Sequence, residues 1–223
     1  MKMFFYSFFS WVFLSGIKTF AQKSELSGVI ISNTGDTIAC TFYKKNWKKQ
    51  PLEIKTHLNN HDTILSPSDI RGFKISTTKT EYVSKKIRPV LYNELLENAA
   101  FGKEPYVDSL RSAFLSILYS GALSLYLYID GLDKKHFFVE SEKEIIEIYT
   151  HLYMISDSDP HFIVPMTNAR TAVLPNKQYI NCLKRLMLNC DEVFSIVDET
   201  TLNEKSLIKL MNAYSKCLSK KSN

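Results

Sequence analysis

Near residue 175 the spacing between apolar side chains changes, and this change divides the chain in two. Before it, apolar and polar residues alternate in short runs. Ile38, Cys40 and Phe42, for example, would share one face of a strand. After it, apolar residues recur every three or four positions, which is the period of an amphipathic helix. We therefore expect an antiparallel β-rich region over residues 22–174 and a helical region over residues 175–223 packed on it.

Clusters of turn residues divide the β-rich region into strands. The cluster Asn33–Asp36 separates two β-rich runs, 26–31 and 37–43, and predicts a hairpin. Shorter runs predict further strands at 52–56, 63–65, 70–76 and 81–87.

Three longer apolar runs predict a meander buried on both faces, at 113–119, 123–129 and 136–139. Residues 93–101 fit a short helix, and residues 161–174 fit a loop with a short strand. Residues 142–154 fit either a strand or a short helix.

The helical region contains three candidate helices. Apolar residues at helical spacing define the first: Tyr179, Ile180, Leu183, Leu186 and Met187. A short helix is expected over 191–197. A third begins after Asn203, a residue type that often caps helix N-termini. Its apolar positions are Leu207, Leu210, Met211, Tyr214 and Leu218. The predicted fold class is α+β: an antiparallel β-sheet or partly open β-barrel followed by two or three helices.

The first 21 residues have the features of a secretory signal peptide. Lys2 gives a positive start, residues 4–17 are mostly apolar or aromatic, and Thr19 and Ala21 are small residues before a possible cleavage site. The apolar run is short for a membrane span, which needs roughly 20 residues, although an uncleaved anchor is the competing interpretation. We expect residues 1–21 to be removed and the protein to be periplasmic or secreted, with the outer membrane as a surface where it can associate.

Charge and hydropathy narrow the choice of partners. Without residues 1–21 the chain holds 26 basic and 23 acidic residues, a formal charge of +3. That excess is too small to favour nucleic acid, which needs a clustered basic face. No later segment reaches membrane-spanning length, so no transmembrane segment is expected after signal removal.

The four cysteines allow three pairings. Export makes oxidation possible. If the third helix packs antiparallel on the short second helix, the chain returns past Cys190 near residues 211–214. Cys217 lies one or two turns further on, a distance that a frayed chain at Cys190 could span, and we predict a disulfide between these two residues. Cys182 lies among apolar helix positions and Cys40 on the apolar side of a strand, so both are expected to be buried thiols.

Several short motifs resemble an uncharacterised family of secreted proteins and N-terminal modules from Bacteroidota. They are Gly28–Ile30 leading to Gly35–Ile38, residues 66–73, residues 121–126, and a tail containing Tyr179, Leu183, Cys190, Asp191, Leu207, Leu210, Tyr214 and Cys217. In such proteins the module sometimes precedes an outer-membrane β-barrel. The resemblance implies no catalytic residues.

One basic aromatic stretch is the clearest candidate for a binding surface. Lysines surround two aromatic residues in the run Tyr43, Lys44, Lys45, Asn46, Trp47, Lys48 and Lys49. Lys44, Lys45, Trp47, Lys48 and Lys49 could contact an anionic lipid or glycan. The alternative is a solvated hairpin loop whose lysines prevent edge-to-edge strand pairing.

Other candidate sites are weaker. His57 and His61 would share a face on a helix, as metal ligands do, but they lie in a predicted turn. The acids Glu140, Glu142, Glu144 and Glu147 could supply a catalytic pair, but such a run at a strand end is more often a solvated surface. We find no nucleophile elbow and no glycine-rich phosphate loop, and we expect no metal and no cofactor.

These observations favour an exported, non-enzymatic binding or assembly module of the bacterial cell envelope, with an envelope protein or an anionic glycan or lipid as partner. An envelope hydrolase with a dispersed active site is the alternative. A pocket holding a histidine and two acids would favour the hydrolase, whereas an unpaired sheet edge would favour the interaction module.

Overall fold

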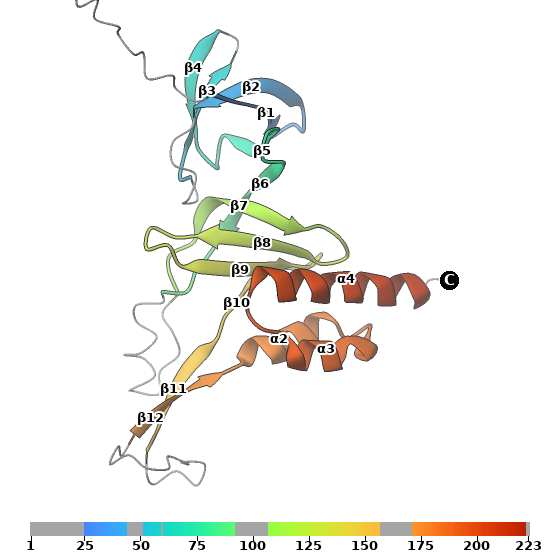
Figure 1. Cartoon of the computed structure of the whole chain (residues 1–223). Coiled ribbons are helices and arrows are strands. Elements are labelled where there is room, and N and C mark those ends of the chain that lie inside the picture. Colours follow the sequence, from blue (N-terminus) through green and yellow to red (C-terminus); the bar gives the residue numbers. More distant parts are fainter. Residues whose placement is uncertain (1–24, 44–50, 59, 92–106, 157–170, 222–223) are drawn as a thin grey trace, which may run out of the picture.

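A computed structural model describes residues 25–43, 51–58, 60–91, 107–156 and 171–221 (Figure 1). Ten strands form one antiparallel sheet, and two more form a separate ribbon. The sheet strands are β1 (Glu25–Ser32), β2 (Thr37–Tyr43), β3 (Ile54–Leu58), β4 (His61–Leu65), β5 (Ile70–Ile75), β6 (Thr80–Ile87), β7 (Arg111–Tyr119), β8 (Ser124–Ile129), β9 (Lys135–Glu140) and β10 (Ile145–Ile148).

The sheet is open, with the strand order β10-β9-β8-β7-β6-β5-β1-β2-β3-β4. This resolves the choice between a sheet and a partly open barrel in favour of the sheet. Every neighbouring pair is antiparallel, and only β1 and β5 are neighbours without being consecutive in sequence. The two ends of the sheet are β4 and β10, which Figure 1 places far apart.

The predicted hairpin at the N-terminal end of the β-rich region is confirmed. β1 pairs with β2 from Glu25↔Tyr43 to Ile31↔Thr37, and Phe42 is fully buried while Cys40 packs beside it. These strands contribute to an N-terminal core made of Ile30, Phe42, Ile54, Ile70, Phe73, Ile75, Tyr82 and Phe114. A Cβ at Gly28 would lie 2.2 Å from the carbonyl oxygen of Lys74, so only glycine allows β1 and β5 to approach this closely.

The strands β7–β9 are apolar on both faces, as the sequence predicted, and each face has its own core. Leu125, Leu127, Phe137 and Val139 point toward the helices. The opposite face, which we call the far side, carries a core made of Ile87, Ala113, Leu115, Tyr126, Tyr128 and Phe138. The alternation of side chains along each strand separates the two sets.

The helical region packs on the first of these faces, beside β7–β9 (Figure 1). It consists of α2 (Gln178–Leu186), a 3₁₀ turn η2 (Asp191–Val193), α3 (Phe194–Glu199) and α4 (Glu204–Lys221). Three α-helices agree with the expectation of two or three. On α4 the buried residues recur every three or four positions: Leu207, Leu210, Met211, Tyr214 and Cys217.

Asn203 caps α4 as predicted. Its Oδ1 accepts the backbone N–H of Ser206 at 2.9 Å, and its carbonyl oxygen accepts the N–H of Leu207 at 3.0 Å. The first bond satisfies an N–H group that the first turn of a helix cannot pair internally, and the second is the first backbone bond of the helix. The start of α4 is therefore fixed by local sequence.

The segment left open between strand and helix forms strands. β10 covers Ile145–Ile148, and β11 (His151–Ser156) pairs with β12 (Thr171–Asn176) from His151↔Asn176 to Ser156↔Thr171. β12 therefore extends two residues into the region that was expected to be helical, ending at Asn176, and α2 begins at Gln178. The helix predicted over residues 93–101 lies outside the described residues.

Candidate functional site: the exposed sheet edge at β4

The strand β4 forms one end of the sheet and pairs with β3 alone among the described residues. The two strands meet in a two-residue turn, with Leu58 opposite His61 and Asn60 at φ 65°. In such a hairpin the residues flanking the turn exchange both backbone hydrogen bonds, and alternate residues beyond them do the same. The N–H and C=O groups of Asp62 and Ile64 therefore point away from β3. We call β4 with these outward-facing groups the β4 edge.

Asp62 is the centre of a polar network on the β4 edge. Tyr43 donates its hydroxyl hydrogen to Oδ1 at 2.7 Å, and Nδ1 of His57 lies 3.0 Å from the same oxygen. Nζ of Lys55 lies 3.1 Å from Oδ2. The hydrogen bond with His57, followed by those with Tyr43 and Lys55, lowers the pKa of Asp62 well below its usual range. Asp62 is therefore ionised at neutral pH and orders one row of side chains across three strands.

Exposed apolar side chains lie at the same end of the sheet. Ile64 is 58% exposed, and Leu52, just before β3, is 73% exposed. Ile64 lies opposite Lys55 in the β3–β4 register. A strand edge with outward-facing backbone groups and an exposed isoleucine can pair with another strand unless something covers it.

His57 and His61 come to lie on opposite faces of the β3–β4 hairpin. His57 is opposite Asp62, whereas His61 is opposite Leu58, and directly opposed residues share a face. The two imidazoles therefore cannot bind one metal ion together. No group of histidine, cysteine, aspartate and glutamate side chains in the described part of the chain is arranged to hold a metal ion.

A buried imidazole on the far side of the sheet is the other candidate for chemistry. Nδ1 of His136 lies 2.8 Å from Glu147 Oε1, and its Nε2 lies 3.4 Å from Asp130 Oδ2. The backbone N–H of Val90 donates to Glu147 Oε2 at 2.7 Å. Side-chain exposure is 2% for His136 and 4% for Glu147. A substrate could not reach this imidazole, so its contacts serve to hold β9, β10 and the segment at Val90 together.

A second polar group on the far side joins β6, β8 and β9. Nζ of Lys85 and the hydroxyl of Tyr126 both bond the carboxylate of Glu140. Burial, with the hydrogen bond to Glu140, raises the pKa of Tyr126 to about 12. Of the four acids considered as a catalytic pair, Glu140 and Glu147 are thus used in internal contacts, while Glu142 and Glu144 lie in the β9–β10 connection.

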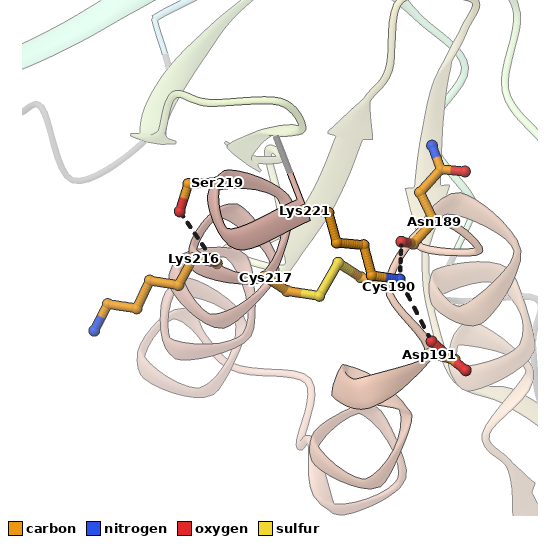
Figure 2. Close-up of a disulfide and its surroundings, with 7 residues drawn as sticks. All are labelled: Asn189, Cys190, Asp191, Lys216, Cys217, Ser219 and Lys221. Atoms are coloured by element: carbon orange, nitrogen blue, oxygen red, sulfur yellow. Dashed lines mark hydrogen bonds and ion pairs between the residues drawn. A yellow bond between two sulfur atoms is a disulfide. The ribbon is translucent and has the colours of Figure 1, made fainter. Parts of the chain in front are cut away.

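The predicted disulfide is confirmed. Cys190 and Cys217 are bonded, with their Cα atoms 6.1 Å apart. Figure 2 shows the bond joining the chain before η2 to the last turns of α4, where Lys221 Nζ donates to the carbonyl oxygen of Asn189 at 2.9 Å. Cys40 and Cys182 are unpaired and only partly buried, and burial raises the pKa of both thiols.

The basic stretch Lys44, Lys45, Trp47, Lys48 and Lys49 lies outside the described residues. The chain enters it after Tyr43, at the end of β2, and leaves it at Pro51, shortly before β3. None of the helices in the described part of the chain combines the length and the apolar character needed to cross a membrane.

Sequence reasoning missed the polar networks around Asp62, His136 and Glu140. One signal was present for His136: it occupies a strand position of the same parity as Phe138, a buried residue of the far-side core. No comparable signal marks Asp62, because its partners come from β2 and β3, and the sequence does not state how these strands pair with β4.

Comparison with known proteins adds no assignment: no family model matches the chain, and no curated protein or solved structure is significantly similar to it.

Proposed function

We propose that this chain is an exported, non-enzymatic binding or assembly module of the bacterial cell envelope. The observation that carries the proposal is the β4 edge, where the outward-facing backbone groups of Asp62 and Ile64 have no strand partner among the described residues and lie beside an exposed apolar side chain. Addition of a strand to such an edge is a common mode of protein recognition. The resemblance to secreted modules of Bacteroidota agrees with a role in assembly.

Export is supported by the N-terminal signal-like sequence and by the disulfide. Disulfides persist in the periplasm and outside the cell, and they are rare in the reducing cytosol. The bond between Cys190 and Cys217 therefore fits an exported protein.

The basic stretch extends the proposal to anionic partners. Lys44, Lys45, Trp47, Lys48 and Lys49 belong to the connection between β2 and β3, and Lys55 of β3 contacts the ring of Tyr43 at 5.2 Å. A lipid or glycan carrying negative charge is the partner class that such residues recognise.

The hydrolase alternative has one observation in its favour, the histidine between two carboxylates. Its weakness is burial: only 2% of the His136 side chain is exposed. A general base must reach the proton that it removes, and this imidazole is enclosed by its own partners. The described residues therefore favour binding over catalysis.

Site-specific photo-crosslinking in intact cells tests the proposal. A photoreactive residue replaces Ile64, which is 58% exposed on the β4 edge, and the matched control replaces Leu188, which is 68% exposed in the connection after α2. We expect protein adducts at position 64 that are several-fold more abundant than at position 188. Equal yields at the two positions would contradict an interaction surface at β4.

A further inference from the structure

We propose that the β4 edge pairs with the β4 edge of a second copy of this chain, antiparallel, about a two-fold axis passing through Thr63. The pairing would join two ten-stranded sheets into one continuous sheet. This inference rests on the proposed function, since it names the partner of the same surface.

The backbone of β4 is self-complementary in this arrangement. Two-fold symmetry pairs residues whose numbers have a constant sum, and an axis at Thr63 places Asp62 opposite Ile64 of the second copy, and Ile64 opposite Asp62. The outward-facing groups of β4 belong to these two residues. All of them become paired, in four N–H···O=C bonds, and none is left over.

Neighbouring registers are less favourable. An axis at Asp62 would oppose two carboxylates directly, which is destabilising, and would place Asn60, with φ 65°, in a strand pair. An axis at Ile64 would require the N–H of Ser66 on each copy, which already donates to Asp69 Oδ2 at 2.7 Å. Thr63 is therefore the centre that the local geometry favours.

Side chains are compatible with the same axis. Thr63 meets its own copy in a non-hydrogen-bonded pair, and Thr–Thr pairs across strands are favourable. On the other face, Ile64 covers Asp62 of the second copy, and Lys55, which is opposite Ile64 in its own hairpin, lies one strand further on. Across the new pairing the order is Lys55, Ile64 and then Asp62 of the second copy, so no two like charges are directly opposed.

The other end of the sheet is less open to such pairing. Arg185 of α2 approaches Glu144, just before β10, at 3.7 Å, so a helix flanks that edge. The β4 edge has no helix of the described residues beside it (Figure 1).

Cysteine cross-linking tests the register. In a background with Cys40→Ser and Cys182→Ser, the chain purified after export carries either Thr63→Cys or Ile64→Cys. Residues opposed in a non-hydrogen-bonded pair have Cα atoms about 4.5 Å apart, whereas the two Ile64 positions would be separated by about 8 Å, beyond disulfide reach. We expect mild oxidation to give a covalent dimer with Thr63→Cys at least tenfold faster than with Ile64→Cys.

Sedimentation velocity tests the association without cross-links. The chain should show a concentration-dependent dimer that Ile64→Lys abolishes and Leu188→Lys preserves, because a lysine on an edge strand opposes pairing. Circular dichroism on both variants checks that each is folded. If Ile64→Lys does not fold, cross-linking of Thr63→Cys remains the test.

A chain that stays monomeric at its highest soluble concentration and forms no Thr63 cross-link would overturn the inference. Faster cross-linking at position 64 would overturn the register. If the cellular photo-adducts at position 64 contain a different protein, self-pairing is wrong while the proposed interaction module stands. If no adducts form, the proposed function fails as well.

Discussion

At the residue scale, Asp62 and Glu147 show how exposure and burial give two carboxylates different structural roles. Asp62 is exposed and ionised, and its three partners arrange the surface of β2, β3 and β4. Glu147 is buried, and it divides its oxygens between His136 and the backbone of Val90. The first orders a surface, and the second joins separate segments, because a buried carboxylate must have its hydrogen bonds satisfied within the protein.

The raised pKa of Tyr126 predicts how the free energy of unfolding changes at alkaline pH. Its folded-state pKa of about 12 lies above the unfolded value of roughly 10. The resulting stabilisation is complete below roughly pH 10 and is lost as pH rises through 12. We expect the free energy of unfolding to fall by about 1–2 kcal/mol over this window, after allowance for solvent screening. Tyr126→Phe should remove that part of the slope in urea titrations.

Glu140→Gln provides the matched control for this titration. It removes the charge beside the Tyr126 hydroxyl and leaves a side chain of similar size. We expect it to reduce the alkaline slope in part. A slope unchanged in Tyr126→Phe would show that this hydroxyl does not titrate in the window.

At the scale of elements, the disulfide fixes the helical region. It joins residues 27 positions apart, and the chain-entropy relation gives roughly 3–4 kcal/mol for a loop of that length. We predict that the double change Cys190→Ser and Cys217→Ser lowers the free energy of unfolding by this amount, measured by urea denaturation.

Cys182→Ser is the control for the disulfide, because that thiol is unpaired on a neighbouring helix. Its effect should be well under that of the double change. Equal losses would mean that cysteine packing, and not the cross-link, stabilises the helical region.

The cap at Asn203 and the hairpin of β1 and β2 were predictable because each depends on residues close in sequence. The strand assignments succeeded for the same reason, since alternation is local. The disulfide joins residues 27 positions apart and was predictable because the two neighbouring helices were expected to pack antiparallel. The β1–β5 pairing and the His136 contacts were not predictable, because they depend on which distant strands become neighbours. Residues 142–154 stayed ambiguous since isoleucine and glutamate there fit both periods, and pairing with β9 and β12 decided for strands.

At the scale of the whole molecule, one continuous sheet carries separate hydrophobic cores. The N-terminal core lies under β1–β6, and the helices cover β7–β9. Phe114 of β7 links them: it is fully buried in the N-terminal core, with its ring 5.0 Å from that of Phe73. Its sequence neighbours Ala113 and Leu115 belong to the far-side core.

Phe114→Ala tests whether the two halves unfold together. A buried phenylalanine replaced by alanine costs about 3–5 kcal/mol, and because β7 belongs to both halves we expect hydrogen-exchange protection to fall in β1–β5 and in β8–β9 alike. The exposed-site control Leu188→Ala should change neither. Loss confined to β1–β5 would mean that the halves are independent folding units.

The strand order also has a consequence for how the chain would fold if it is exported as proposed. Because eight of the nine pairings in the ten-stranded sheet join consecutive strands, a chain emerging N-terminus first from a translocation channel can complete each pairing soon after its strands appear. The β1–β5 contact closes when residue 75 has emerged, and by residue 87 the N-terminal core lacks a single side chain, the ring of Phe114. We expect the N-terminal half to collapse first, with a gap where the ring of Phe114 belongs. β7 then fills this gap when the second half of the chain has emerged.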